Sequence, residues 1–538
     1  MESKAVFEGY VYQKPKINWT NINDLKRELK KVDLSKTIDL EEGGIPVMSN
    51  GKTAFIDTSD SHFMLYGASG FGKSLFCFMP LICVLAMANE NMVITDPKGE
   101  LYTRTANFLN NKGYNIRVIN LRDYDSDGYN PLRYPLKLYR QGEKDKACTL
   151  ASNVIGALAQ RQESHGSIDP FWPDTAKAYD NGLLPLLMDS YEDEDSVNFL
   201  SLADYYTNDT AELLSRYIYD KYSRLNTVNA AITNLKTVLA EPEKTKMSTL
   251  STCSSFVQPF IQNDKLARMM SNSTFEIEEI CEEKTALYIV TDDTTTICNP
   301  IVEVLISQIQ TYAVDKAFRS KNGKLKHRLN FVLDELCSYH ICNLNEALAT
   351  HRSRNIRYYL CVQSLDLLEK KYKNYKSLQT NCATTLFLGS TEKELLKDIS
   401  KRCGTTNITE NGEKEPLVSI EELMTLKKSW YSKEVVYLNL KDNIRFVSEL
   451  PSIEKYEMFC KGVAKIPKKK HPPVRVYTFR HLLSDISNNR ATIPFVECFL
   501  EQQKIEKNKI PKDTTISDDL HRELEAKWDE LFGSCEED

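Results

Sequence analysis

Apolar residues occur along this chain mainly in short unbroken runs rather than in alternation with polar ones. Such runs recur as HFMLYG, NMVITD, YNIRVINL, TALYIVTD, LNFVLDE, IRYYLCVQ, TTLFLGS and EVVYLNL, with helical stretches between them. Continuous apolar runs are typical of strands that are covered on both faces, and therefore of a mostly parallel sheet between layers of helices. The pattern predicts an α/β fold.

One long interval of the chain lacks a convincing strand. Between residues 148 and 282 the segments DTAKAYDNGLLPLLMDSY, FLSLADYY, TAELLSRYIYDKY and LNTVNAAITNLKTVLA have helical periodicity. We therefore expect an all-α domain inserted into the α/β domain. The predicted organisation is an N-terminal extension (1–40) with a helix around NDLKRELKKV, the α/β domain in two parts (41–147 and 283–450), the all-α insertion (148–282) and a C-terminal extension (451–538).

Composition narrows the possible functions only a little. The 538 residues carry a net charge of −6, so the chain is not a generally basic coat for nucleic acid, and any such contact must be local or inside a channel. The fourteen cysteines form no CxxC pair and the eight histidines are dispersed, which predicts a reducing compartment and no metal cluster. The longest apolar run, residues 75–88, is too short to span a bilayer and is expected to be a buried helix.

The first candidate site is a phosphate-binding loop at GASGFGKS. It comprises Gly67, Ala68, Ser69, Gly70, Phe71, Gly72, Lys73 and Ser74, which together satisfy the pattern G-x-x-x-x-G-K-[ST]. The loop follows an apolar strand and precedes an apolar helix, so backbone N–H groups and a helix N-terminus can cradle phosphates. We expect Lys73 to reach the β- and γ-phosphates of ATP and the Ser74 hydroxyl to bind Mg²⁺. The α/β domain is thus a candidate nucleotide-binding domain.

A second candidate element is RLNFVLDELCSYH, in which an apolar strand ends at Asp334 and Glu335. Alone, such a pair is often only a solvated strand end. Together with the loop at residues 67–74 it is the expected acidic motif, with Asp334 holding Mg²⁺ and Glu335 as the general base that polarises water.

The third element is NEALATHRSRNIRYYLCVQS. Its strand ends at Gln363, which could sense a γ-phosphate, and Arg352 or Arg354 could reach the site of a neighbouring subunit and stabilise transition-state charge. Without the two preceding motifs, we would interpret these residues simply as a surface arginine and a glutamine at the end of a strand.

The strand NMVITD leads into the charged turn DPKGE. Asp96 and Lys98 could order the phosphate side of the site. Equally, the turn could be a salt-bridged strand-to-helix connection with Glu100 in the first turn of the helix.

Taken together, these stretches resemble the TraG-type coupling-protein ATPases of conjugative type IV secretion. The similarity covers about residues 40–450, and the order of its motifs is specific. TDPKGELY, GYNPL, DPFW, VLDEL, LATHRSRNI followed by VQS, and NCATTLFLGSTEKELLKDISKRCG are similar to successive blocks of that family.

The resemblance implies a RecA-like P-loop motor that assembles as a homo-hexamer, with the helical insertion facing the incoming DNA–protein substrate. By position, Lys73, Ser74, Asp334, Glu335 and Gln363 would be site residues. Arg352 would be the arginine finger presented in trans, and Arg354 aligns less well. A ring lumen would confine basic contacts, which would let a net acidic chain handle DNA.

The expected function is ATP-driven pumping of single-stranded DNA, with its relaxase, to a type IV secretion channel and its ATPases or inner-membrane subunits. The alternatives are a nucleotide-binding cargo receptor for protein secretion and another hexameric DNA translocase. Family members usually begin with transmembrane helices, which this sequence lacks. We therefore expect the protein to act at the cytoplasmic face of a bacterial membrane. Either its membrane anchor is absent from this sequence, or a separate membrane subunit recruits it.

Two features near the C-terminus remain open. The basic run Lys468-Lys469-Lys470-His471 could contact phosphates, although a solvated linker is the preferred interpretation. The acidic tail has an apolar stripe at helical spacing, formed by Leu520, Leu524, Trp528, Leu531 and Phe532. It could dock on the motor or bind a basic relaxase.

Overall fold

The computed structural model describes residues 4–7, 10–13, 20, 22–36, 39–164, 169–191, 193–222, 230–405 and 415–487. Its strands are β1 (Lys4–Phe7), β2 (Tyr10–Gln13), β3 (Lys30–Asp33), β4 (Ile45–Ser49), β5 (Thr53–Asp57), β6 (Phe63–Gly67), β7 (Asn91–Asp96), β8 (Asn115–Asn120), β9 (Thr285–Val290), β10 (Leu329–Leu333), β11 (Ile356–Val362), β12 (Thr384–Gly389), β13 (Ser432–Asn439) and β14 (Ile444–Pro451).

The main sheet has eleven strands among the described residues, in the order β1-β2-β14-β13-β12-β6-β11-β10-β7-β9-β8. The seven strands from β12 to β8 run parallel, and β13, β14, β2 and β1 extend one edge in antiparallel pairs. All residues of β6, β7, β9, β10, β11 and β12 are buried, as expected for strands covered on both faces. The predicted α/β fold with a mostly parallel sheet is confirmed.

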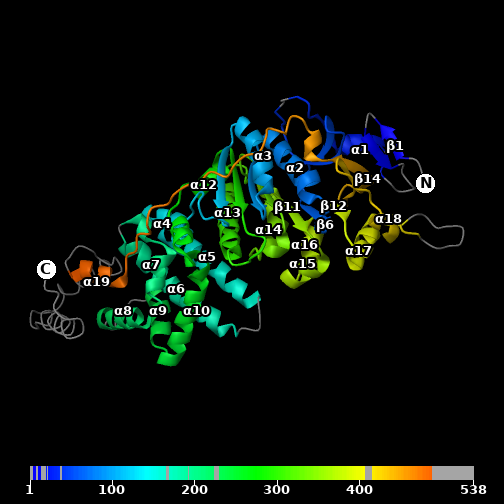
Figure 1. Cartoon of the computed structure of the whole chain (residues 1–538). Helices are drawn as coiled ribbons and strands as arrows, with labels where there is room; N and C mark the ends of the chain where they lie inside the picture. The colour runs from blue at the N-terminus through cyan, green and yellow to red at the C-terminus, as the bar shows by residue number, and fades with distance from the viewer. Residues whose placement is uncertain are drawn as a thin grey trace, which may run out of the picture. The chain divides into compact units, whose positions relative to one another are not determined.

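Helices cover both faces of this sheet. In the sequence, the helices outside the insertion are α1 (Ile22–Glu28), α2 (Met79–Met87), α3 (Glu100–Asn111), α13 (Asn299–Arg319), α14 (Leu344–Thr350), α15 (Leu365–Lys371), α16 (Tyr375–Asn381), α17 (Lys393–Cys403), α18 (Ile420–Met424) and α19 (Phe479–Ser487). Of these, α19 starts against the insertion and not on the sheet, because the Phe479 N–H donates to Asp204 at 3.1 Å. Figure 1 shows α2 and α3 on one side of the sheet and α14, α15 and α16 on the other. The predicted buried helix is the π-helical turn Ser74–Phe78 continued by α2, whose residues are all buried.

A small second sheet, in the order β3-β5-β4, is antiparallel. Its β3 corrects the prediction of one helix over NDLKRELKKV, because α1 ends at Glu28 and Lys30–Asp33 forms a strand. Pairing of β3 with β5 and burial of Val32 outweigh the helical propensity of the lysines.

Between β8 and β9 the described residues contain helices and no strand, as predicted. These helices are α4 (Arg133–Arg140), α5 (Lys144–Ser164), α6 (Phe171–Ser190), α7 (Phe199–Asp204), α8 (Asn208–Tyr222), α9 (Ala230–Leu239), α10 (Glu243–Ile261), α11 (Asp264–Ser271) and α12 (Ile277–Glu282). β8 and β9 are parallel neighbours at one edge of the sheet, so the segment that holds the inserted helices leaves at the carboxyl end of β8 and rejoins at the amino end of the adjacent strand β9. The domain boundaries themselves stay a prediction.

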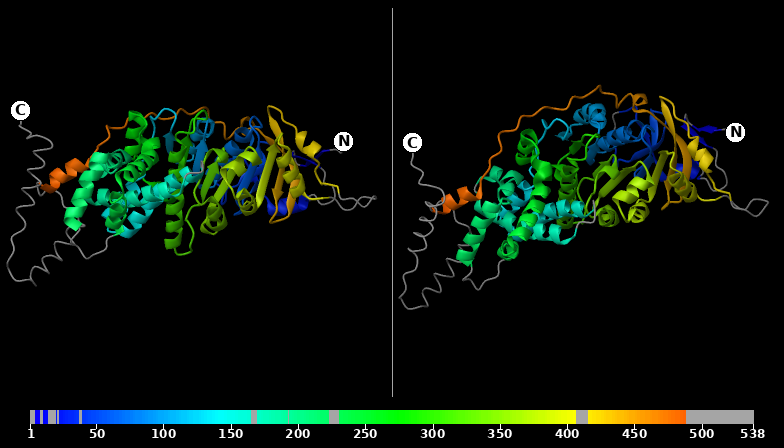
Figure 2. Two further views of the ribbon diagram at one scale, coloured as in Figure 1. Left: turned by 90° about the horizontal axis from the view of Figure 1, so that it is seen from below. Right: turned by 60° about the horizontal axis from the view of Figure 1, so that its bottom comes forward.

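Residues 456–478 form an extended strap, the orange trace that crosses from the sheet domain to the inserted helices in Figure 2. The Ala464 N–H donates to the Thr103 carbonyl of α3 at 2.8 Å. The Lys469 ammonium pairs with Asp127, and His471 Nε2 lies 2.7 Å from the Ser126 carbonyl.

Farther along the strap, Arg475 pairs with Asp193 at 3.1 Å, and the Tyr477 N–H donates to Ser201 Oγ at 3.2 Å. Lys468 lies 3.0 Å from Asp125 and is largely exposed. Residues 468–471 thus belong to an extended segment in which Lys468 and Lys470 are exposed, while carboxylates of the domain pair with Lys468 and Lys469.

The chain forms two compact units, Met1–Arg480 and His481–Asp538. The apolar stripe predicted for the acidic tail lies outside the described residues. Within the part of the chain that the structure describes, no helix combines the length and hydrophobicity needed to cross a lipid bilayer.

Candidate functional site

The candidate site lies at the carboxyl ends of four adjacent parallel strands. In the order β6-β11-β10-β7, these strands lead into the glycine-rich loop, Gln363, the Asp334–Glu335 pair and the turn after Asp96. Ligands of open α/β sheets bind at this edge, where the loops after neighbouring strands converge. The topology thus brings together four segments that are spread between residues 67 and 363 of the sequence.

The loop at residues 67–74 depends on its glycines. Gly70 and Gly72 have φ of +79° and +83°, values that favour glycine, and a Cβ on Gly72 would lie 2.4 Å from the Phe76 ring. A Cβ on Gly67 would lie 3.0 Å from Cγ of Lys73, so the lysine stem packs over the start of the loop. Lys73 is buried, and its ammonium group lies near enough to Asp334 to act on the pKa of that carboxylate.

The tip of the loop is held by the neighbouring strand β12. The Ala68 N–H donates to the Gly389 carbonyl at 3.0 Å, and a Cβ on Gly389 would lie 2.4 Å from the Phe71 ring. The Lys428 ammonium donates to the Gly70 carbonyl. Residues beyond the glycine-rich motif therefore fix the conformation of the loop.

Asp334 is a buried carboxylate at the tip of β10. The residue is 7% exposed, and burial raises the pKa of its carboxyl to about 6, although the nearby Lys73 ammonium acts in the opposite direction. Within the described structure Oδ1 is buried and has no hydrogen-bond partner, while the Asp334 carbonyl accepts from Thr95 Oγ1 at 2.9 Å. The strand tip is thus fixed, and one carboxylate oxygen stays available to a cation.

Glu335 follows in the left-handed backbone region, with φ of 59° and ψ of 50°. This conformation is uncommon for a non-glycine residue and is often found at functional sites. Gln363 Nε2 donates to Glu335 Oε1 at 2.9 Å, so the amide orients the carboxylate. The structure therefore brings Lys73, Asp334, Glu335 and Gln363 to one edge of the sheet.

Asp96 stabilises the connection between β7 and α3 at this edge of the sheet. Its Oδ2 accepts the N–H of Tyr102 in the first turn of α3 at 2.8 Å, which satisfies an otherwise unpaired helix N-terminus. Burial raises the Asp96 pKa to about 6. Lys98 is exposed and Glu100 begins α3. Of the two interpretations of DPKGE, the geometry of Asp96 favours the strand-to-helix connection.

Arg352 does not join the other predicted residues within this chain. It lies in a short 3₁₀ turn, His351–Arg354, before β11, whereas Gln363 follows β11. Seven strand residues separate the two by roughly 20 Å. Arg352 is half-exposed, 3.8 Å from Asp60, and Arg354 donates to the Thr350 carbonyl at 2.7 Å.

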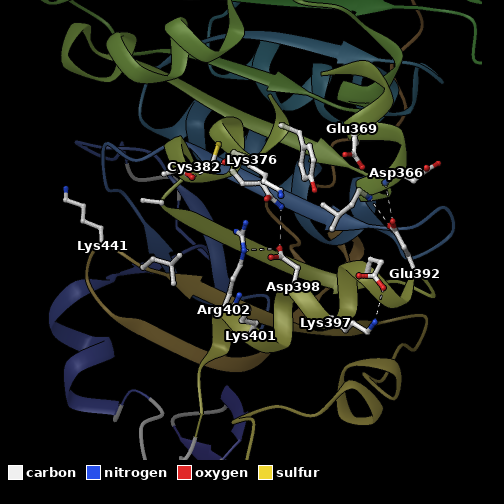
Figure 3. A pocket seen from close by; sticks show the side chains of 17 residues that line it. Asp366, Glu369, Lys376, Cys382, Glu392, Lys397, Asp398, Lys401, Arg402 and Lys441 are labelled. Atoms are coloured by element: carbon white, nitrogen blue, oxygen red, sulfur yellow. Dashed lines mark hydrogen bonds and ion pairs between the residues drawn. The ribbon is translucent and has the colours of Figure 1, made fainter. Parts of the chain in front are cut away.

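A separate cavity of about 1010 Å³ lies between α15, α16 and α17 (Figure 3). Its lining includes the acidic residues Asp366, Glu369, Glu392, Glu394 and Asp398 and the basic residues Lys376, Lys397, Lys401, Arg402 and Lys441. Arg402 is directed at Asp398, with 2.9 Å between Nε and Oδ2. Because no residue of the 67–74 loop lines this cavity, it is distinct from the candidate site.

Comparison with protein families gives a match over residues 13–438 to the family described as type IV secretory system conjugative DNA transfer. No curated protein matches the sequence.

Comparison with solved structures finds the same fold in bacterial coupling proteins. The bacterial conjugative coupling protein TrwB in complex with sulphate has a TM-score of 0.56 and 15% identity, over 88% of this chain and 100% of that one. TrwB with the ATP analogue ADPNP has a TM-score of 0.53 and 16% identity, over 88% and 99%. TrwB with ADP and Mg²⁺ has a TM-score of 0.52 and 14% identity, over 85% and 95%. These similarities confirm the predicted RecA-like P-loop fold.

Proposed function

Because the chain belongs to the type IV secretory system conjugative DNA transfer family, we propose that it is an ATP-driven coupling protein for single-stranded DNA. It would recruit a relaxase–DNA substrate and move the DNA to a type IV secretion channel at the cytoplasmic face of the membrane. The observation that carries this proposal is the convergence of Lys73, Asp334, Glu335 and Gln363 at one sheet edge.

The residues at this edge fit a triphosphate and Mg²⁺. Loop N–H groups and Lys73 would hold the β- and γ-phosphates, while the Ser74 hydroxyl and the Asp334 carboxylate would hold the metal. The unpartnered Oδ1 of Asp334 supports this assignment, since a buried carboxylate oxygen without a partner is costly. When bound, Mg²⁺ supplies positive charge that offsets the charge of the phosphates.

Glu335 would act as the general base. Its carboxylate lies one residue beyond the proposed metal ligand, and Gln363 orients it. In this position it can accept a proton from water attacking the γ-phosphate. Gln363 would connect the state of the γ-phosphate to β11, and the other end of β11 carries Arg352.

Arg352 would complete the site of the next subunit in a homo-hexamer. Its position at the edge of the sheet opposite to Glu335 fits a ring in which one subunit presents that edge to its neighbour's site. The His351–Arg354 turn is held from within, because His351 Nδ1 lies 2.7 Å from the Tyr358 hydroxyl, which also accepts from Gln310 at 3.0 Å. A fixed turn can present an arginine in a defined direction.

We expect Mg²⁺-dependent nucleotide binding to weaken as the pH falls through about 6. Burial raises the Asp334 pKa to this value, and the metal must then compete with a proton for the carboxylate. One pH unit below the pKa leaves roughly a tenth of the carboxyl ionised, so the Mg²⁺ requirement should rise about tenfold at pH 5.

Titration calorimetry with Mg²⁺ and a non-hydrolysable ATP analogue, at pH 5 and pH 7.5, measures this shift. Asp334→Asn is the control, since any pH dependence that survives in the variant belongs to the nucleotide. Equal pH dependence in the parent and the variant would contradict the assignment of Asp334.

Steady-state ATP hydrolysis with and without single-stranded DNA tests the function. A DNA motor is expected to turn over faster with DNA, and Lys73→Ala should abolish both hydrolysis and conjugative transfer. Full transfer by Lys73→Ala would favour a cargo receptor that does not move DNA. Stimulation by double-stranded DNA alone would favour another kind of translocase.

A further inference from the structure

The turn that precedes β13 carries two strongly exposed aromatic rings. Trp430 is 89% exposed and Tyr431 is 63% exposed. The turn itself is ordered by Ser429, whose N–H donates to the Ser432 carbonyl at 2.8 Å and whose hydroxyl accepts the N–H of Tyr431 at 3.2 Å. Exposure of a large apolar indole to water on an ordered turn is unfavourable, which suggests that the ring contacts a ligand or a partner.

Both sides of this turn are attached to the phosphate-binding loop. Lys428 on one side donates to the Gly70 carbonyl. Lys433 on the other side lies with its ammonium 5.4 Å from the centre of the Phe71 ring. Since Trp430 is two residues from Lys428, their Cα atoms are at most about 7 Å apart. The backbone that carries Trp430 therefore lies near the tip of the loop, on the side that faces β12 and β13.

The sheet order indicates which part of a bound nucleotide would reach that side. From β6, the groups proposed to meet the γ-phosphate lie toward β11 and β10, at Gln363 and Glu335. The turn with Trp430 lies in the other direction, beyond β12 at the start of β13, which runs antiparallel to β12 and so begins at the same edge. A triphosphate aligned along this edge, with its γ-phosphate toward Gln363 and Glu335, would direct its sugar and base toward the turn that carries Trp430.

We propose that Trp430 is the stacking platform for the nucleotide base, and that Lys428 fixes the platform to the phosphate loop. The inference rests on the proposed function, because it requires a nucleotide at Lys73. Tyr431 serves less well as a platform, since the Lys455 ammonium lies 4.7 Å from the centre of its ring. The open indole face is available to a purine.

Stacking on an indole discriminates little between purines, because every base has a π-face. An enzyme that relies on Trp430 for its base contact should therefore bind ATP and GTP analogues with similar affinity. Selectivity would arise at the triphosphate and Mg²⁺ rather than at the base.

The test compares a ligand that has a base with one that has none. The full chain, Trp430→Ala and Trp430→Phe are titrated calorimetrically with a non-hydrolysable ATP analogue and with inorganic tripolyphosphate, both with Mg²⁺. Phe318→Ala is the matched control, because Phe318 is an exposed aromatic residue (81%) at the end of α13. Exposed substitutions of this kind change stability little.

We expect Trp430→Ala to bind the ATP analogue about 10-fold more weakly (about 1.4 kcal/mol), within the range for base–aromatic stacking. Tripolyphosphate should bind the variant as it binds the parent. Trp430→Phe and Phe318→Ala should retain parental affinity for both ligands.

An unchanged affinity of Trp430→Ala for the analogue, or an equal loss for both ligands, would overturn the inference. Unchanged binding together with weaker self-association would assign Trp430 to a subunit contact instead. If the parental chain bound neither ligand, the proposed function would itself be contradicted, and the inference with it.

Discussion

Replacing Glu335 with glutamine should lower ATP hydrolysis at least about 100-fold and leave nucleotide and Mg²⁺ binding intact. A positioned general base contributes roughly 10² to 10⁴ to the rate. Glutamine has nearly the same shape and can still pair with Gln363, so the variant loses the proton acceptor rather than the architecture. Steady-state turnover, together with calorimetric binding of an ATP analogue, separates these two effects.

Glu369→Gln is a suitable control, because Glu369 is a carboxylate in the separate cavity between α15, α16 and α17. This control should hydrolyse ATP at the parental rate. More than a tenth of parental activity in Glu335→Gln would mean that another group accepts the proton. Loss of nucleotide binding together with activity would show that Glu335 supports the site rather than the reaction.

Replacing Arg352 with alanine should reduce hydrolysis about 1,000-fold, the lower end of the effect of an arginine finger. The residue is half-exposed and its ion pair with Asp60 spans 3.8 Å, so removing it should cost little stability. Nucleotide binding by the isolated subunit should be unaffected, because Arg352 is remote from the Glu335 site of its own chain. Arg354→Ala provides the neighbouring control and should retain most activity.

Mixing the two inactive variants tests whether Arg352 acts in trans. In a mixed ring, an Arg352→Ala subunit keeps Glu335 and can receive Arg352 from an adjacent Glu335→Gln subunit. Such interfaces are complete, so hydrolysis should reappear on mixing and increase with assembly. Mixed assemblies that stay inactive, or an equal loss in Arg354→Ala, would contradict the proposed role of Arg352.

The sequence predicts those parts of the fold that depend on neighbouring residues along the chain. β6, β7, β10 and β11 are buried on both faces, so each is one apolar run that ends at a polar tip. Lys73 could be recognised from the glycine-rich pattern of residues 67–74, and the Asp334–Glu335 pair from its place at the end of an apolar strand. Their convergence followed from the parallel sheet.

Other features depend on distant partners and were missed. β14 alternates between buried and half-buried residues, and its period-two pattern in IRFVSEL was a usable signal. β3 is stabilised by its pairing with β5. The strap is held in place by ion pairs with acidic residues of the domain, such as the pair between Lys469 and Asp127. Nothing in the sequence around Lys428 indicates a bond to Gly70, since the two are 358 residues apart.

The strap has a mechanical consequence for the inserted helices. β8 and β9 alone would act as a two-stranded hinge, but the strap adds a third tether that reaches Asp193 and Ser201. Any swing of the insertion must stretch this tether or release its ion pairs. Since exposed pairs weaken as salt rises, ionic strength would set the stiffness of the hinge.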